Sequence, residues 1–249
     1  MIPKALTEKP ENNFKMTKDF TKNKAALLQL KKPKAVIFDW DNTLVDTWPL
    51  ICTAIDTTLI SLGKEPWGLE KVRDNVHKSM RESFAEIFAD DWQQASKIYQ
   101  STYRSIHLDK IELLPNSLEL INKLAEKGVM QFVVSNKIGL TLRKEVKRIG
   151  IDKKFFSLIG AGDADFDKPS TAPVNLALMG SGIDPAQDEV WFIGDTIADI
   201  DCAHNSKCSA ILYSNLENQV SKTVPAEILS GKSGALPVYF NHQQLIDLL

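Results

Sequence analysis

Residues 34–47 read KAVIFDWDNTLVDT, a short apolar run followed by three aspartates. Its apolar segment Ala35–Phe38 has the length and the composition of a buried β-strand. The run stops at Asp39, and a second aspartate, Asp41, follows two positions later. Two carboxylates this close raise the free energy of the folded state unless a positive group lies between them. The stretch therefore predicts a buried strand that delivers two carboxylates to a site holding a positive charge.

The same pattern of a short apolar run followed by polar residues recurs along the chain. The later runs are Met130–Val134, Ser157–Ile159, Val190–Ile193 and Ala210–Tyr213. Amphipathic stretches with a helical period lie between them, as in residues 117–127 and 139–148. Continuous apolar strands that alternate with helices are typical of a parallel sheet covered on both faces. We therefore expect an α/β fold with a Rossmann-like, three-layer core, whose ligands bind at the carboxyl ends of the strands.

Two segments do not follow this alternation. Residues 1–33 are polar and rich in lysine, and we expect a flexible arm with one short helix at Lys24–Leu30. Residues 47–113 contain no convincing strand but show apolar residues at helical spacing, which predicts a helical cap over the site. The core then consists of residues 34–46 and 114–249.

The composition is that of an ordinary soluble protein. The chain has 249 residues, of which 43% are apolar and 25% charged, and a net charge of −2. No overall basic field therefore attracts nucleic acid, and no apolar run approaches the roughly 20 residues that span a bilayer. The N-terminus lacks the apolar segment of a secretory signal, and the three unpatterned cysteines favour a reducing compartment. We expect a cytoplasmic protein without nucleic-acid or membrane partners. The sequence does not indicate which oligomeric state the protein adopts.

Polar side chains follow four of the predicted strands. They are Asp39 and Asp41 after the first, Ser135 and Asn136 after the second, Lys168 after the third, and Asp195 and Asp199 after the fourth. The carboxyl ends of parallel strands share one edge of a sheet, so these side chains should converge. Several carboxylates in one place need a cation, and oxygen ligands without Cys or His select Mg²⁺. The hydroxyl of Ser135 and the ammonium of Lys168 suit phosphate oxygens, so the sequence predicts a Mg²⁺ site that binds a phosphate ester.

The spacing of the first two aspartates suits a reaction at phosphorus. An aspartate beside Mg²⁺ can act as a nucleophile and form an aspartyl-phosphate, which Asp39 is placed to do. Asp41, two residues along, can protonate the leaving alcohol and then activate water.

Together these residues form four ordered motifs that resemble those of the haloacid dehalogenase superfamily. The resemblance is to its phosphoglycolate-phosphatase-like branch with a helical cap. The motifs are DWDNTLVD at 39–46, SN at 135–136, KP at 168–169 and GDTIAD at 194–199. One position departs from the pattern, because the family usually has glycine where this chain has Asn42. Asparagine tolerates the left-handed conformation better than most residues, so we expect the turn to be preserved.

The resemblance implies a role for each residue of the first motif. Asp39 resembles the nucleophile, whose side chain also binds Mg²⁺. Asp41 resembles the general acid/base, with its backbone carbonyl on the metal. Thr43 resembles the residue that steadies this loop, and we group it with the phosphate-binding residues.

The other motifs supply the remaining implied roles. Ser135 and Asn136 would bind the phosphoryl group. Lys168 would neutralise the nucleophile and the phosphoryl oxygens, and so counts among the catalytic residues. Asp195 resembles a direct metal ligand, and Asp199 an acid that reaches the metal through water or an orienting contact.

The predicted function is a Mg²⁺-dependent phosphatase that acts on a small phosphorylated metabolite, similar to phosphoglycolate, through an aspartyl-phosphate. A sugar-phosphate mutase or phosphotransferase on the same scaffold is an alternative, which a requirement for a bisphosphate would reveal. A non-catalytic binding protein that docks through its basic arm is a second alternative, against which the intact set of acidic residues and Lys168 argues.

Overall fold

A six-stranded parallel sheet forms the centre of the computed structural model, which describes residues 23, 25–76, 80–214 and 235–249. Its strands are β1 (Ala35–Phe38), β4 (Met130–Ile138), β5 (Ser157–Ala161), β6 (Val190–Gly194), β7 (Ser209–Tyr213) and β8 (Val238–Tyr239). They are arranged in the order β5-β4-β1-β6-β7-β8, and each neighbouring pair is parallel. The predicted α/β fold is therefore confirmed, and β8 is a strand that the sequence did not predict.

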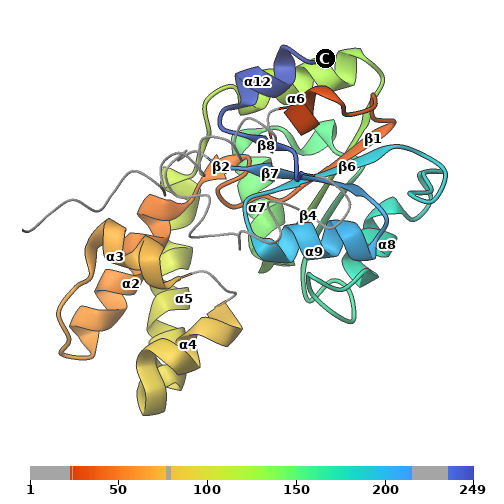
Figure 1. The fold of residues 1–249 in the computed structure, drawn as a ribbon. Helices are drawn as coiled ribbons and strands as arrows, with labels where there is room; N and C mark the ends of the chain where they lie inside the picture. Colours follow the sequence, from red (N-terminus) through yellow and green to blue (C-terminus); the bar gives the residue numbers. More distant parts are fainter. Residues whose placement is uncertain (1–22, 24, 77–79, 215–234) are drawn as a thin grey trace, which may run out of the picture.

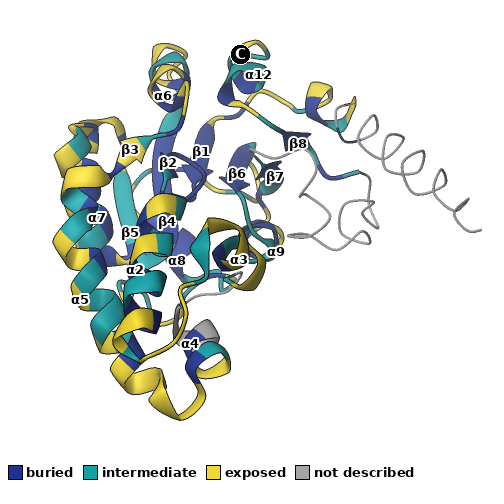
Figure 2. Ribbon diagram, turned by 90° about the vertical axis from the view of Figure 1, so that its left-hand side faces the viewer, coloured by how far each residue is buried: buried dark blue, intermediate teal, exposed yellow. Residues whose placement is uncertain are grey.

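Helices cover both faces of this sheet (Figure 1). They are α6 (Ser117–Glu126), α7 (Gly139–Ile149), α8 (Ala172–Leu178), α9 (Ile197–Asn205) and α12 (His242–Ile246), with the short 3₁₀ helix η2 (Asp152–Lys154). Successive side chains of β1 point to opposite faces: Val36 and Phe38 pack with residues of α6, α7 and α12, and Ala35 and Ile37 with residues of α8 and α9. Figure 2 shows the buried strands between helices whose outer faces are exposed. Each fully buried large side chain contributes about 1.5–3 kcal/mol, so this packing fixes the strand ends firmly.

The segment between β1 and α6 forms a helical insertion, which we define as residues 48–110. It consists of α2 (Trp48–Ser61), α3 (Gly68–Asn75), α4 (Met80–Phe88), the 3₁₀ helix η1 (Ala89–Asp91) and α5 (Trp92–Lys110). Part of its packing is internal, in a cluster made of Ile55, Leu59, Val72, Phe84, Phe88 and Ala95. The chain enters and leaves through a short antiparallel pair, β2 (Val45–Asp46) and β3 (Glu112–Leu113). Across the described part of the chain, no helix is both long and apolar enough to cross a membrane.

The predicted arm is described only near its end. Residues 1–22 and 24 lie outside the described part of the chain. Residues 25–28 are helical, and Leu27 is only 5% exposed because it packs into the core. The indole nitrogen of Trp191 donates to the carbonyl of Lys31 at 3.0 Å. The last residues of the predicted arm are therefore attached to the core.

Candidate active site

The loop after β1 carries both aspartates of the opening motif and reverses direction at Asn42. Asn42 has a φ of 56°, in the left-handed region, and its amide donates to the carbonyl of Val45 at 2.8 Å. Its side-chain oxygen accepts hydrogen bonds from the amide and the hydroxyl of Thr47, at 3.2 and 3.1 Å. Glycine could make the turn but not these two bonds. The expectation that Asn42 preserves the turn is confirmed.

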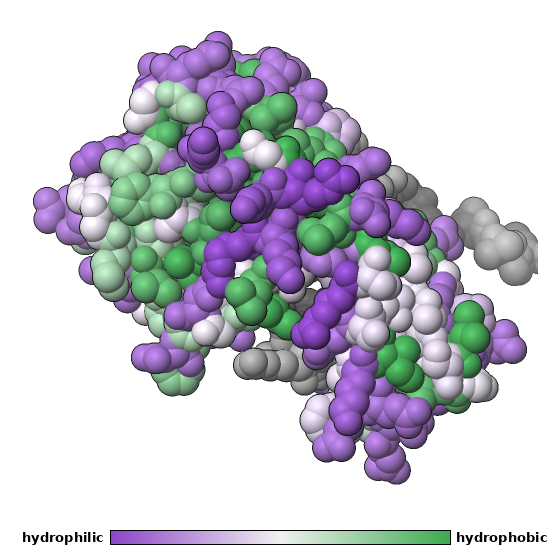
Figure 3. All heavy atoms as spheres, turned by 180° about the vertical axis from the view of Figure 1, so that it is seen from behind, coloured by the Kyte–Doolittle hydropathy of each residue, from purple (hydrophilic) through white to green (hydrophobic). Residues whose placement is uncertain are grey.

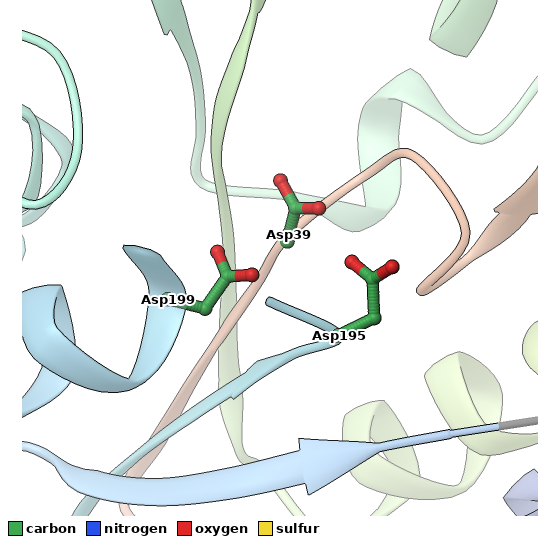
Figure 4. A group of neighbouring side chains, drawn as sticks. All are labelled: Asp39, Asp195 and Asp199. Atoms are coloured by element: carbon green, nitrogen blue, oxygen red, sulfur yellow. The ribbon is translucent and has the colours of Figure 1, made fainter. Parts of the chain in front are cut away.

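Three carboxylates meet at the carboxyl ends of β1 and β6. Asp39 follows β1, Asp195 follows β6, and Asp199 lies in the first turn of α9, with one oxygen of each within 4.8 Å of the others. Figure 4 shows the three carboxylate groups turned toward one another. Burial and the charges of Asp199 and Asp41 raise the pKa of Asp39 to about 6, against the opposing effect of Lys168. Burial and the charges of Asp39 and Asp199 raise the pKa of Asp195 well above its usual range. This purely oxygen donor set, costly without a cation, fits Mg²⁺.

Lys168 brings a positive charge to two of these carboxylates. Its ammonium nitrogen lies 2.6 Å from Asp39 Oδ1 and 2.6 Å from Asp199 Oδ1, and the residue is only 7% exposed. Burial alone would lower the pKa of Lys168, but the two carboxylates outweigh it and raise that pKa. Lys168 therefore stays charged in the site.

Asn136 holds the backbone of Lys168. Its side-chain oxygen accepts from the Lys168 amide at 2.9 Å, and its Nδ2 donates to the Lys168 carbonyl at 3.1 Å. One hydrogen of Nδ2 is not used by this pair of bonds. The contact fixes Lys168 in place, and phosphate binding by Asn136 stays a prediction.

Asp199 is held on both of its oxygens. Oδ1 contacts Lys168, and Oδ2 accepts from the amide of Thr196 at 3.0 Å and from its hydroxyl at 2.6 Å. Gly194 makes room for this arrangement, because a Cβ atom at that position would overlap the carboxylate of Asp199. These contacts suit the orienting role predicted for Asp199.

The two hydroxyl residues of the motifs lie in the same region. Thr43 is fully buried, and its hydroxyl donates to Asp195 Oδ1 at 3.4 Å, so it orients a predicted metal ligand. Ser135 is buried, and its Oγ accepts from the amide of Lys137 at 3.2 Å. Among the described residues no acceptor takes the Ser135 hydroxyl hydrogen, which suits the phosphoryl contact predicted for it.

The side chain of Asp41 does not join the three carboxylates, and it pairs with a lysine that the sequence analysis missed. Asp41 Oδ1 lies 2.7 Å from the ammonium nitrogen of Lys137. Burial raises the pKa of Asp41 and Lys137 opposes this effect. The signal for Lys137 was its place directly after Ser135 and Asn136, at the end of an apolar run.

A second missed residue, Glu145, lies behind this pair on α7. Its side chain is fully buried, and Oε2 is 2.8 Å from the ammonium of Lys137. The sequence contained a signal here too, because Glu145 falls on the apolar stripe of the helix between Leu142 and Val146. A charged residue at such a position has to find buried partners.

The comparison with known proteins agrees with this geometry. A family model of haloacid dehalogenase-like hydrolases matches residues 36–213, a span that contains the whole site. Phosphoglycolate phosphatase 1 of Pseudomonas aeruginosa is 25% identical over 218 residues, which are 82% of this chain and 79% of that protein. Pyrophosphatase PpaX of Bacillus velezensis is 27% identical over 176 residues, 71% of this chain and 81% of that protein. The crystal structure of a haloacid dehalogenase superfamily hydrolase from Ehrlichia chaffeensis is similar with a TM-score of 0.58 and 29% identity, covering 88% of this chain and 97% of that one.

Proposed function

Because the chain belongs to the haloacid dehalogenase-like hydrolases and is an enzyme of the phosphatase type, we propose that it is a cytoplasmic, Mg²⁺-dependent phosphatase. Its substrate is a small phosphorylated metabolite, and the reaction passes through an aspartyl-phosphate. The observation that carries the proposal is the position of Asp39, which combines a 2.6 Å contact to Lys168 with two further carboxylates nearby. A lysine and a carboxylate cluster around one aspartate are what a phosphoryl-accepting nucleophile needs.

In the first step, a carboxylate oxygen of Asp39 attacks phosphorus and forms the new P–O bond. The bond from phosphorus to the ester oxygen breaks, and Asp41 donates a proton to the departing alcohol. Lys168 and the hydroxyl of Ser135 stabilise the negative charge on the other phosphoryl oxygens. In the second step, Asp41 takes a proton from water, which attacks the aspartyl-phosphate and releases phosphate and free Asp39.

The residues that would hold a magnesium ion are the side chains of Asp39 and Asp195 and the backbone carbonyl of Asp41. Asp199, whose oxygens are already held, would contribute by orientation or through water. When bound, Mg²⁺ supplies positive charge that offsets the carboxylates and the phosphoryl oxygens. Thr43 orients Asp195 toward this position.

The substrate class follows from the relatives and from the insertion. Both a phosphoglycolate phosphatase and a pyrophosphatase are related to this chain, and both names describe small substrates that carry phosphate. We propose that the helical insertion acts as the cap that selects the substrate and limits the entry of water. Figure 3 shows a hollow between the insertion and the core on one face of the molecule, bordered by both hydrophilic and hydrophobic side chains.

The test is phosphate release from a panel of substrates, with Mg²⁺ or with EDTA. The panel contains phosphoglycolate, pyrophosphate, sugar phosphates and nucleoside monophosphates. Wild type is compared with Asp39→Asn and with Asp165→Asn, a matched change of an exposed loop aspartate. We expect Mg²⁺-dependent turnover that is lost in Asp39→Asn and kept in Asp165→Asn.

Other outcomes would change the conclusion. Turnover that persists in Asp39→Asn would refute the aspartyl-phosphate. Transfer of phosphate to a sugar with a bisphosphate requirement would favour the mutase, and no turnover from folded protein in Mg²⁺ would favour the binding protein.

A further inference from the structure

We propose that Lys137 and Glu145 are positioning residues for Asp41, and that they connect it to helix α5 of the insertion. The inference rests on the proposed function, in which Asp41 is the general acid/base. It assigns a task to buried charged groups that the mechanism above does not use.

Lys137 forms an ion pair with one oxygen of Asp41 and leaves part of the Asp41 side chain accessible. Its ammonium nitrogen lies 2.7 Å from Asp41 Oδ1 and 2.8 Å from Glu145 Oε2, and it donates to the hydroxyl of Tyr103 at 2.6 Å. The Lys137 side chain is only 7% exposed, so its long stem has little freedom to leave these partners. Asp41 Oδ1 is buried and forms an ion pair with Lys137, whereas the Asp41 side chain as a whole is 26% exposed. A proton donor needs this combination, a side chain that is held in place and is still accessible to a substrate.

Glu145 holds the same loop from a second direction. Its Oε2 accepts from the indole nitrogen of Trp40 at 2.7 Å as well as from Lys137 at 2.8 Å. Trp40 lies in the chain between Asp39 and Asp41, so this bond anchors the segment that bears both aspartates. A buried carboxylate is stable only when hydrogen-bond donors surround it. If this position served packing alone, an apolar residue like its neighbours on the same stripe of the helix would be sufficient.

The other oxygen of Glu145 faces the insertion. Oε1 accepts from the hydroxyl of Tyr103 at 3.1 Å and lies 2.8 Å from His107 Nδ1. Tyr103 and His107 are one turn apart on α5, and their rings stack with centroids 5.4 Å apart. Figures 1 and 2 show α5 beside α7, the helix that carries Glu145. The insertion therefore contributes directly to the network that holds the acid/base.

The experiment compares two leaving groups in order to distinguish residues that position the proton donor from residues that only stabilise the fold. We would measure kcat/KM at saturating Mg²⁺ for phosphoglycolate, whose alkoxide leaving group needs a proton, and for p-nitrophenyl phosphate, whose phenolate does not. Because kcat/KM reports only the steps through departure of the leaving group, the later use of Asp41 as a base does not enter. The variants are Lys137→Met, Lys137→Arg and Glu145→Gln, with Lys144→Met as a control on an exposed lysine of α7.

We expect Lys137→Met to lower kcat/KM for phosphoglycolate by about 30- to 100-fold and for p-nitrophenyl phosphate by less than about threefold. Lys137→Arg should recover part of the loss, Glu145→Gln should show the same selective pattern at smaller size, and Lys144→Met should match wild type. In an Asp41→Asn background, Lys137→Met should cause no further loss, because its effect passes through Asp41.

Two results would overturn the inference. One is an equal loss on both esters, which indicates a general structural defect. The other is a full additional loss from Lys137→Met in the Asp41→Asn background. Wild type without Mg²⁺-dependent activity on any substrate of the panel would instead refute the proposed function, so the two failures are distinguishable. Should Lys137→Met fail to fold, Lys137→Arg and Glu145→Gln carry the same comparison.

Discussion

The charge balance of the site predicts that Asp195→Asn makes the metal-free protein more stable while activity is lost. Asparagine has the shape of aspartate and keeps an oxygen that can accept from Thr43, so the substitution removes charge and little else. In the wild type, burial and the carboxylates of Asp39 and Asp199 raise the pKa of Asp195. The metal-free fold therefore keeps Asp195 against an electrostatic penalty that the variant lacks.

The size of this penalty follows from the distances. Oxygens of the three carboxylates lie within 4.8 Å of one another, and charges at that separation repel by about 3 kcal/mol at an effective dielectric constant of about 20. Asp195 has two such neighbours, Asp39 and Asp199, and Lys168, which contacts both, offsets about one repulsion. Partial protonation relieves some of the remaining repulsion, so we expect Asp195→Asn to raise the free energy of unfolding by up to about 3 kcal/mol. For a chain of this size that is a rise in Tm of about 6 to 12 °C.

The assay is thermal unfolding near neutral pH in EDTA and in Mg²⁺. In EDTA, Asp195→Asn should have a higher Tm than wild type, and the exposed control Asp165→Asn should not. In Mg²⁺, wild type should gain stability by binding the ion, and Asp195→Asn should gain much less. The reasoning is refuted by a lower Tm for Asp195→Asn in EDTA, or by an equal Mg²⁺ gain in both proteins.

Three further predictions concern Lys168, Gly194 and His242. Lys168→Met leaves the carboxylates of Asp39 and Asp199 without their ammonium partner, so turnover should be lost. The free energy of unfolding, measured by urea titration, should fall by about 3 to 5 kcal/mol. An unchanged urea midpoint would contradict this pairing. Gly194→Ala places a methyl group against the carboxylate of Asp199. We expect kcat to fall about tenfold or more while the circular dichroism spectrum stays unaltered. A kcat equal to that of wild type would show that this contact does not matter. Burial lowers the pKa of His242 from 6.5 to about 4, so its contribution to stability is present above pH 6.5 and is lost as the pH falls toward 4, by about 3 kcal/mol. Urea midpoints over this pH range should fall less steeply in His242→Phe, and identical slopes would exclude His242 as the cause.

Local signals in the sequence accounted for most of the fold. Each of the five predicted apolar runs is a strand of one sheet, because a buried parallel strand needs a continuous apolar segment. The turn at Asn42 was also predictable, because asparagine tolerates the left-handed conformation that this position adopts. Two-residue strands such as β2, β3 and β8 are too short to show a period, and the sequence analysis did not find them.

The missed part of the site depends on contacts between distant residues. Glu145 binds Trp40, 105 positions away, and Tyr103, 42 positions away. No spacing rule connects such residues, although a glutamate on an apolar helix face indicated that partners had to exist. Asn136 shows the same limit: the sequence placed it near the phosphate, and the bonds to the backbone of Lys168 became visible only in three dimensions.

The pairing of β2 with β3 also bears on how such enzymes diversify. Since the two crossings between core and insertion are adjacent, with Val45 opposite Leu113, the whole insertion enters and leaves the core at one place. A different insertion could therefore be grafted there without moving the reactive carboxylates, and selectivity could change while the chemistry is inherited. The bonds from Tyr103 and His107 to Glu145 set the condition for such an exchange. A replacement has to bring its own donors to that glutamate, or it leaves Oε1 of a buried carboxylate without a partner behind the acid/base.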